Sequence, residues 1–397
     1  MLVYYETPTG YKSFDGVIVQ DTKIKPYGFY LVKPYKATIE ELKIYYQKLS
    51  DDLEELCDIT KLDYKRLEIL DYKKLIGTLF KIYRGDKKIK YDTIEFYEYE
   101  FFENCFNAGL NTATKGLYEN VQAFDYKKFY AQILGGDKTT FKVPITKGKL
   151  QILKKIPPKK EIQYGIYRVK ISSYSPNISK VFAFNENNYY THIDLIRALD
   201  LSFSKRFDVK IELIQDKEPN ALMYDELIDS KIIFIRYVKK IQEVLLTYPK
   251  NKLCKFLLSG LWGNLSQKGH TKKLTMNEYD ELENKEKYNL VDIHTKYINN
   301  EFVDIFELLH INNIQQTNYR LKSFLTSQGR NKMSQNLTRI QNLDDIIRVC
   351  TDGVILTNEA KYTSRFISKE FIHDDKYNNK NIEIKNVNKI SFFYKND

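Results

Sequence analysis

The sequence predicts an α+β protein, and three observations support this fold class. The 397 residues exceed what one hydrophobic core usually organises, so two or three subdomains are expected. Runs with apolar residues at helical spacing occur together with short runs that alternate with a period of two. The hydrophobic content of 43% is ample for a folded chain.

The charge balance favours a polyanionic partner. Lys and Arg total 63 against 52 for Asp and Glu, which gives a formal net charge of +11. With a pI near 9.0, such a balance suits nucleic acid better than an acidic small molecule. Tyr, Lys, Ile and Asn are also abundant in proteins of AT-rich genomes, so composition alone leaves both explanations open.

Cysteine and histidine usage argues against a zinc site or a disulfide framework. No CxxC pair occurs, and the five His residues show no ligand spacing beside the four cysteines Cys57, Cys105, Cys254 and Cys350. The first residues lack a basic segment followed by an apolar one, and no stretch of about 18 apolar residues occurs. We therefore expect a soluble protein of a reducing cell interior. This interior would be the cytoplasm of a host cell, for a protein encoded by a virus or a plasmid, or an organelle.

In the first part of the chain, strands precede helices. Residues 1–35 contain the strand-like runs GVIVQ and GFYLV, broken by Gly and Pro. A helix is predicted over ATIEELKIYYQKLSDDLEELCDI, with Thr38 or Ser50 as its cap, and another over DTIEFYEYEFFENCFNAG, ending at Gly109. NVQAFDYKKFYAQIL then reads as an apolar strand that leads to Asp125 and a helix.

In the second part, residues 141–215 look strand-rich, with YGIYRVKISSY alternating and KIPPKKE as a linker. A helical hairpin is predicted from DSKIIFIRYVKKIQEVLLTY and NKLCKFLLSGLWGNL, joined at Pro249. A further helix, RLKSFLTSQGRNKMSQNLTRIQ, precedes a strand, turn and strand in IIRVCTDGVILTNE. The polar tail ends in the strand-like run KISFFYK.

Two acidic residues stand out because apolar runs precede them: Asp125 after VQAF and Asp352 after IIRVCT. A strand-end carboxylate that meets a second one from a distant strand forms an oxygen site suited to Mg²⁺. Two such ions stabilise the attacking and leaving oxygens of phosphoryl transfer. Taken singly, however, a strand-end Asp more often forms a turn or caps a helix.

A third element lies on the second helix of the hairpin. Lys255, Ser259 and Trp262 share one face of KFLLSGLWG, while neighbouring leucines supply packing. A Lys and an aromatic on one face can hold a triphosphate and stack near a base. The alternative is a solvated Lys beside a partly buried Trp.

In order along the chain, FDYKKFYAQIL, KFLLSGLWG and VCTDGVIL resemble motifs A, B and C of family B DNA polymerases, especially the protein-primed enzymes of phages, linear plasmids and organelles. The family patterns are DxNSLYP, KxxxNSxYG and YxDTDS. The resemblance implies that Asp125 and Asp352 are the metal ligands, for two Mg²⁺ ions or Mn²⁺ in their place. It also implies that Lys255 binds the incoming nucleotide's phosphates and that Tyr130 excludes a ribose 2′-hydroxyl.

Further segments match the same family frame. Ser259 takes the Asn place of motif B, and Trp262 takes the Tyr place, which implies nucleotide contacts for both. The segment from Phe106 to Gly109, FNAG, stands where these polymerases have the template-touching YxGG loop. Similarity to their palm helix implies a DNA contact for Arg330, and the KxY motif implies one for Lys389.

The departures from the family pattern are specific. Lys127 and Lys128 replace the Asn and Ser of motif A, and Ala131 replaces its Pro. In motif C the first Asp is Cys350 and the Ser is Gly353. The metal-binding carboxylates Asp125 and Asp352 are retained, yet these losses raise the alternative of reduced or absent synthesis.

The stretch before Asp125 is shorter than the exonuclease domain of these enzymes. Its one Asp-x-Glu match, Asp52 to Glu54, lies in a charged helical run and reads as a solvated helix face, so no proofreading is expected. Little sequence follows Lys389 to form a thumb. A partner subunit that supplies thumb or exonuclease functions, or a terminal protein primer, is therefore among the expected partners.

The resemblance implies a right-hand polymerase in four parts. Residues 1–100 would be an N-terminal α/β region, 101–224 the first part of the palm, 225–270 a helical fingers hairpin, and 271–397 the rest of the palm with a minimal tail. The implied reaction is DNA-directed addition of dNTPs to a 3′-hydroxyl of primer-template DNA. The alternative is a catalytically impaired module that binds primer-template DNA or a polymerase partner.

Overall fold

The computed structural model describes residues 3–7, 10–13, 18–19, 29–31, 39–62, 72–204, 206–265, 271–285, 288–298, 301–310 and 317–393. The chain forms two compact units, each described by itself below. The first comprises Met1–Lys88, Tyr130–Thr140 and Ser230–Leu265. The second comprises Ile89–Phe129, Phe141–Asp229 and Ser266–Asp397. The predicted four-part division stays a prediction.

The first unit combines a small sheet with helices. The sheet has the order β3-β2-β1-β4, in which only β1 and β4 are parallel. Its strands are β1 (Val3–Thr7), β2 (Gly10–Ser13), β3 (Ile18–Val19) and β4 (Phe29–Leu31). The helices are α1 (Ile39–Thr60), α2 (Tyr72–Tyr83), most of α4 (Phe129–Gly135), α6 (Ser230–Thr247) and α7 (Lys252–Leu265).

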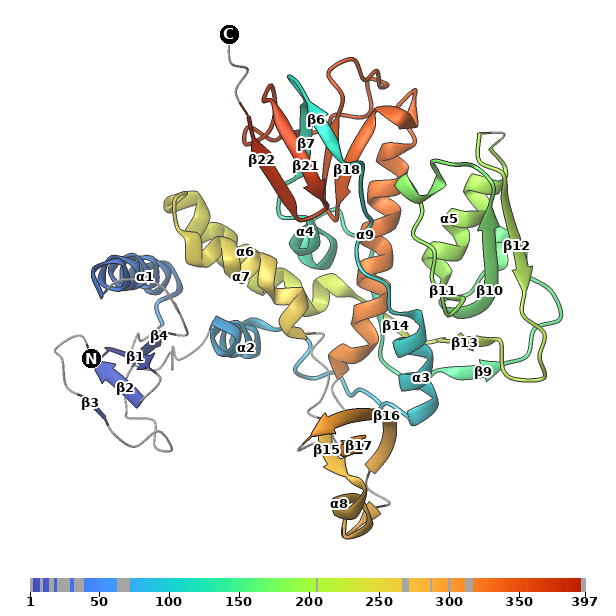
Figure 1. Cartoon of the computed structure of the whole chain (residues 1–397), viewed down its shortest axis with the longest axis horizontal. Helices are drawn as coiled ribbons and strands as arrows, with labels where there is room; N and C mark the ends of the chain where they lie inside the picture. Colours follow the sequence, from blue (N-terminus) through green and yellow to red (C-terminus); the bar gives the residue numbers. More distant parts are fainter. Residues whose placement is uncertain are drawn as a thin grey trace. The chain divides into compact units, whose positions relative to one another are not determined.

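The predicted helical hairpin is confirmed as α6 and α7 (Figure 1). The two helices are tied by the Tyr237 hydroxyl, which donates to the Leu257 carbonyl at 3.0 Å. Phe80 of α2 stacks on Phe234 of α6 with 5.3 Å between ring centroids. Buried aromatic and aliphatic side chains therefore hold the hairpin to α2.

The long helix predicted after Ala37 is also confirmed, as α1. Ser50 lies inside this helix and cannot cap it, and Thr38 lies outside the described residues.

The second unit is built from antiparallel sheets. One five-stranded sheet has the order β20-β7-β19-β18-β5, and a three-stranded sheet has the order β22-β21-β6. Their strands are β5 (Asn111–Ala113), β6 (Gly116–Tyr118), β7 (Gln122–Tyr126), β18 (Ile346–Cys350), β19 (Gly353–Leu356), β20 (Phe371–His373), β21 (Ile382–Asn386) and β22 (Lys389–Phe392). The predicted strands before Asp125, around Asp352 and in the tail are thus confirmed.

Further strands of this unit lie between β7 and β18 in the sequence. A sheet of order β11-β10-β13-β9 also pairs β10 with β12, β8 pairs with β14, and β15, β16 and β17 form a third sheet. The strands are β8 (Lys142–Pro144), β9 (Lys149–Gln151), β10 (Gly165–Ser173), β11 (Tyr189–Thr191), β12 (Val209–Leu213), β13 (Ala221–Met223), β14 (Leu227–Asp229), β15 (Thr271–Thr275), β16 (Tyr288–Ile298) and β17 (Glu301–His310). The helices of the unit are α3 (Phe96–Cys105), α5 (His192–Ser202), α8 (Met276–Asp280) and α9 (Leu321–Leu337).

The five-stranded sheet is covered on both faces. On one face it packs on the three-stranded sheet through a core that includes Ala123, Ile355 and Ile382, and the two sheets lie together in Figure 1. On the other face, Phe124 contacts Phe366 edge to face and Phe371 by stacking. Since both faces bury apolar side chains, the strand positions near Asp125 are fixed from two sides.

One prediction of local structure is wrong, and two segments contain elements that the sequence interpretation missed. The helix expected to run to Gly109 ends at Cys105, with Phe106 in extended geometry as its C-cap. Residues 141–215 are rich in strands as predicted, from β8 to β12, but they also include helix α5, whose N-cap Thr191 accepts a hydrogen bond from the Asp194 backbone N–H at 3.3 Å. The pattern T-x-x-D, from Thr191 to Asp194, is a sequence signal for the start of a helix. Residues 271–310, for which no element is predicted, form β15, α8, β16 and β17.

Among the described residues, no helix combines the length and the apolar character needed to cross a lipid bilayer.

Candidate carboxylate site and nucleotide-facing helix

The fold brings Asp125 and Asp352 together, although they lie far apart in the sequence. Asp125 is on β7, opposite Gly353 of β19, and Gly353 in turn pairs with Cys350 of β18. The Tyr126 backbone N–H donates to the carbonyl of Asp352 at 3.0 Å. This hydrogen bond fixes the turn that carries Asp352 beside the end of β7. We call Asp125 and Asp352 the carboxylate pair.

The turn between β18 and β19 is tight and strained. Thr351 has φ of 57°, and the Asp352 N–H donates to the Cys350 carbonyl at 2.7 Å. A β-branched residue rarely adopts this left-handed conformation, and such outliers gather at functional sites when the surroundings enforce them. Opposite the turn, a Cβ on Gly353 would lie 3.0 Å from Asp125 Oδ1. The glycine therefore leaves room for the Asp125 carboxylate.

Both carboxyl groups ionise with difficulty. Burial, together with the nearby negative charges of Asp352 and Asp374, raises the pKa of Asp125 to about 7. Burial also raises the pKa of Asp352. The positive charge of Arg348, on β18, opposes both shifts. Negative charge at this sheet edge is thus only partly compensated by the protein.

These properties fit a divalent cation. Carboxylate oxygens are the ligands that Mg²⁺ prefers, and a cation would relieve the repulsion that raises the pKa of Asp125. Among the residues described by the structure, however, no group of three or more His, Cys, Asp or Glu side chains is arranged to hold a metal ion. The remaining ligands would come from water and substrate phosphates, as is usual for Mg²⁺.

The residues predicted to face the nucleotide lie in the first unit. On α7, Lys255 and Ser259 are exposed and Trp262 is half-buried, while the intervening leucines are buried, as the helical spacing predicts. The ring of Tyr130, on α4, lies 5.0 Å from that of Trp262, between centroids, at 40°. The structure therefore joins Tyr130 of α4 and Trp262 of α7 in one aromatic pair.

The start of α7 is capped by two residues. Asn251 Oδ1 accepts from the Cys254 N–H at 2.7 Å, and Asp52 Oδ2 accepts from the Lys252 and Leu253 N–H groups at 3.1 and 3.0 Å. A carboxylate at a helix N-terminus is stabilised by the helix dipole. The reading of Asp52 as part of a solvated helix face is therefore wrong, because its carboxylate caps α7; Glu54 of the same run is exposed.

The residues predicted to contact DNA differ in how far they are exposed to solvent. Phe106 is half-buried, with Lys322 Nζ 3.6 Å from its ring centroid. Arg330, on α9, is only 5% exposed and bonds to protein groups, whereas Lys389 is exposed at the start of β22. Gly109 lies against the side chain of Thr351.

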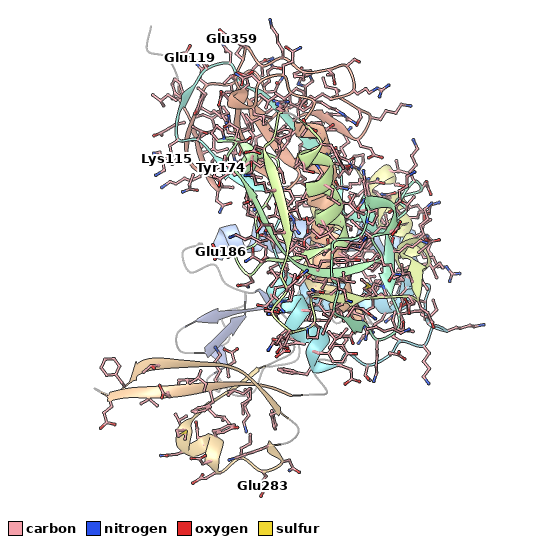
Figure 2. The ribbon with its side chains drawn as sticks, turned by 90° about the vertical axis from the view of Figure 1, so that its right-hand side faces the viewer. Lys115, Glu119, Tyr174, Glu186, Glu283 and Glu359 are labelled. Carbon is pink, nitrogen blue, oxygen red and sulfur yellow. The ribbon has the colours of Figure 1, made fainter. Side chains whose placement is uncertain are left out.

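The sequence interpretation missed two charged residues, Arg348 and Asp374, that interact electrostatically with the carboxylate pair. Arg348 stands two residues before Cys350, so strand periodicity places both on one face, and its Nε donates to the Val387 carbonyl at 2.7 Å. Asp374 directly follows β20. Elsewhere on the surface, Tyr174, which is labelled in Figure 2, has an exposed ring, and Lys210 Nζ lies 5.1 Å from its centroid. The alternating residues around Arg348 were the signal that could have identified it.

No protein-family model and no curated protein sequence matches the chain. Among solved structures, the fold is similar to Phi29 DNA polymerase complexed with single-stranded DNA, with a TM-score of 0.53 and 15% identity over 97% of this chain and 67% of that one. Similarity to the same polymerase complexed with primer-template DNA has a TM-score of 0.50 and 14% identity, over 93% and 62% of the two chains. The chain thus spans about two thirds of that polymerase, and at this identity the likeness establishes the fold alone.

Proposed function

We propose that this protein is a DNA-directed DNA polymerase that adds deoxynucleotides to a primer 3′-hydroxyl. The observation that carries the proposal is the meeting of Asp125 and Asp352 at one sheet edge, in a fold similar to that of a DNA polymerase. The ordered resemblance of motifs A, B and C to the protein-primed family B enzymes supports it. The surplus of positive charge suits a nucleic-acid substrate.

In the proposed reaction, the primer 3′-hydroxyl attacks the α-phosphorus of a dNTP and pyrophosphate leaves. Asp125 and Asp352 would hold the metal, which would polarise the phosphate and stabilise the attacking and leaving oxygens. Lys255, exposed on α7, binds the triphosphate and stabilises charge on the leaving pyrophosphate. Tyr130, supported by Trp262, excludes substrates with a 2′-hydroxyl. Two Mg²⁺ ions, absence of proofreading and an intracellular location are parts of this proposal, which leaves the priming mode open.

A second candidate function is favoured by one observation. Cys350 of β18 pairs with Gly353 of β19, which in turn pairs with Asp125 of β7. In the motif C pattern that this segment resembles, the position of Cys350 carries a further carboxylate. A thiol is a poor ligand for Mg²⁺. If the missing carboxylate is essential, the protein is a module that binds primer-template DNA, or a polymerase partner, without synthesis.

Primer extension separates the two functions. With a labelled primer-template, dNTPs and Mg²⁺ or Mn²⁺, the polymerase proposal expects template-directed extension. Gel-shift titration of the same DNA measures binding separately. Tight DNA binding without extension under either metal would replace the polymerase proposal by the binding module, and absence of both would contradict the two proposals together.

Replacement of Lys255 by Ala is expected to raise KM for dNTP by about 10- to 100-fold, because a charge-assisted contact with phosphate contributes about 1.5–3 kcal/mol. Steady-state primer extension at varied dNTP concentration measures this effect. Lys252→Ala, an exposed Lys one turn earlier on α7, is the matched control and is expected to leave KM unchanged. Equal effects of the two substitutions would mean that KM depends on the total positive charge of α7 and not on a specific contact of Lys255.

A further inference from the structure

Arg330 of α9 is built into the protein interior. Its Nε and one terminal nitrogen donate to Asp194 Oδ1 and Oδ2 at 3.2 and 2.7 Å, and the latter nitrogen also donates to Ser327 Oγ at 2.8 Å. The other terminal nitrogen donates to the carbonyls of Asn107 and Ala108 at 2.6 and 2.8 Å. Asp194 is itself 4% exposed. The guanidinium therefore contacts protein groups in the interior, not a surface where DNA phosphates lie.

The two carbonyls belong to the segment that reaches the candidate site. Immediately after Ala108, a Cβ on Gly109 would lie 2.7 Å from Thr351 Oγ1 and 3.0 Å from its Cβ and Cγ2. The next residue, Leu110, accepts a hydrogen bond from the Thr351 N–H at 2.9 Å. Strand β5 then starts at Asn111, which pairs with Cys350. The segment from Phe106 to Leu110, which we call the FNAGL segment, thus forms one wall of the turn before Asp352.

Contacts from two directions hold this turn. The FNAGL segment contacts Thr351, the strained residue, while the Tyr126 N–H binds the carbonyl of Asp352 from β7. A non-glycine residue remains in the left-handed region only where its surroundings impose it. Displacement of the segment would therefore let Thr351 relax and would move the Asp352 carboxylate relative to Asp125.

We propose that Arg330 and Asp194 are positioning residues: through the FNAGL segment they hold Thr351, and thereby set the position of the Asp352 carboxylate. This inference rests on the proposed function, since it takes the carboxylate pair as the reaction centre. It replaces the direct DNA contact that the family resemblance implies for Arg330. Arg330 then acts without touching DNA or nucleotide.

Gly109→Ala tests the proposal without breaking the buried ion pair. The added methyl group would overlap Thr351, so Mn²⁺ affinity, measured from the electron paramagnetic resonance signal of free Mn²⁺, is expected to fall about tenfold, as for residues that orient metal ligands. The double variant Gly109→Ala/Thr351→Gly removes the overlapping atoms and is expected to recover wild-type affinity within about twofold. Gly77→Ala on α2, where the nearest atom would be 3.6 Å away, is the matched control and is expected to change nothing.

The salt dependence of DNA binding distinguishes a positioning role from a phosphate contact. For Arg330→Gln, a lost phosphate contact would reduce the slope of log K against log salt by about 1, whereas a positioning residue leaves the slope unchanged while Mn²⁺ affinity falls. Circular dichroism establishes whether this variant folds; if it does not, Gly109→Ala and its rescue decide. A reduced slope for Arg330→Gln, or an Mn²⁺ affinity that Gly109→Ala leaves unchanged, would overturn this inference but not the proposed function. A wild-type chain that binds no Mn²⁺ would overturn both the inference and the proposed function.

Discussion

Replacement of Asp352 by Asn is expected to reduce primer extension on the order of 10³-fold, because it removes one of the two charges that hold the metal at the reacting phosphate. Asn is nearly isosteric with Asp, and the turn is held by backbone hydrogen bonds from Thr351 and Tyr126 that the substitution leaves in place. The fold and the affinity for primer-template DNA should therefore persist. Single-turnover primer extension with saturating DNA and dNTP measures the loss.

Glu359→Gln is the matched control for this charge change. Glu359 is exposed, follows the far end of β19, and is labelled in Figure 2. Its substitution is expected to leave the extension rate within about twofold of the wild type, as for most surface changes. Full extension by Asp352→Asn would remove the carboxylate pair as the reaction centre and, with it, the assignment of motif C.

Replacement of Asp125 by Asn is expected to stabilise the metal-free protein at pH 8 by about 1–3 kcal/mol, while abolishing stabilisation by Mg²⁺. Burial and the charges of Asp352 and Asp374 raise the pKa of Asp125 from 3.8 to about 7. The folded state thus binds this proton more tightly than the unfolded chain does. The corresponding stability is present below pH 4 and is lost as pH rises to about 7, where the carboxylate must ionise beside its neighbours.

Thermal or urea unfolding in a chelator, followed from pH 5 to pH 8, measures this effect. The wild type should lose the rest of the Asp125 contribution over that range, and Asp125→Asn should not. Mg²⁺ should restore stability to the wild type at pH 8, because it binds the ionised pair, and have little effect on the variant. Asp208→Asn, at an exposed position in the same unit, controls for the loss of one negative charge. A variant less stable than the wild type at pH 8 in chelator would contradict a repulsive carboxylate pair.

Local sequence signals predicted many of the elements. The spacing of leucines predicted which face of α7 is buried, and the apolar runs around Thr351 and Asp352 predicted a strand, a turn and a strand. These patterns depend on neighbours within a few residues, through side-chain direction and turn conformation. Prediction was weaker where two signals competed, as at α5, whose N-cap Thr191 is also the last residue of strand β11.

The functional hypothesis needed more than periodicity. Taken singly, Asp125 and Asp352 fit a turn or a cap as well as a metal site, and the ordered resemblance to polymerase motifs was the reason to predict one shared site. The similarity of fold to Phi29 DNA polymerase agrees with that resemblance at the level of architecture. Membership of the protein-primed family, and the individual site roles, stay predictions.

Local sequence pattern predicts the secondary-structure elements, the exposed face of Lys255 and Ser259, and two carboxylates isolated in apolar surroundings. Which distant groups meet follows from tertiary packing: Asp125 with Asp352 through β7 and β19, Asp52 with the start of α7, and Arg330 with Asp194. The physical reason is that strand register and burial are set by packing across the whole core, whereas periodicity records only which side of its own element a residue occupies.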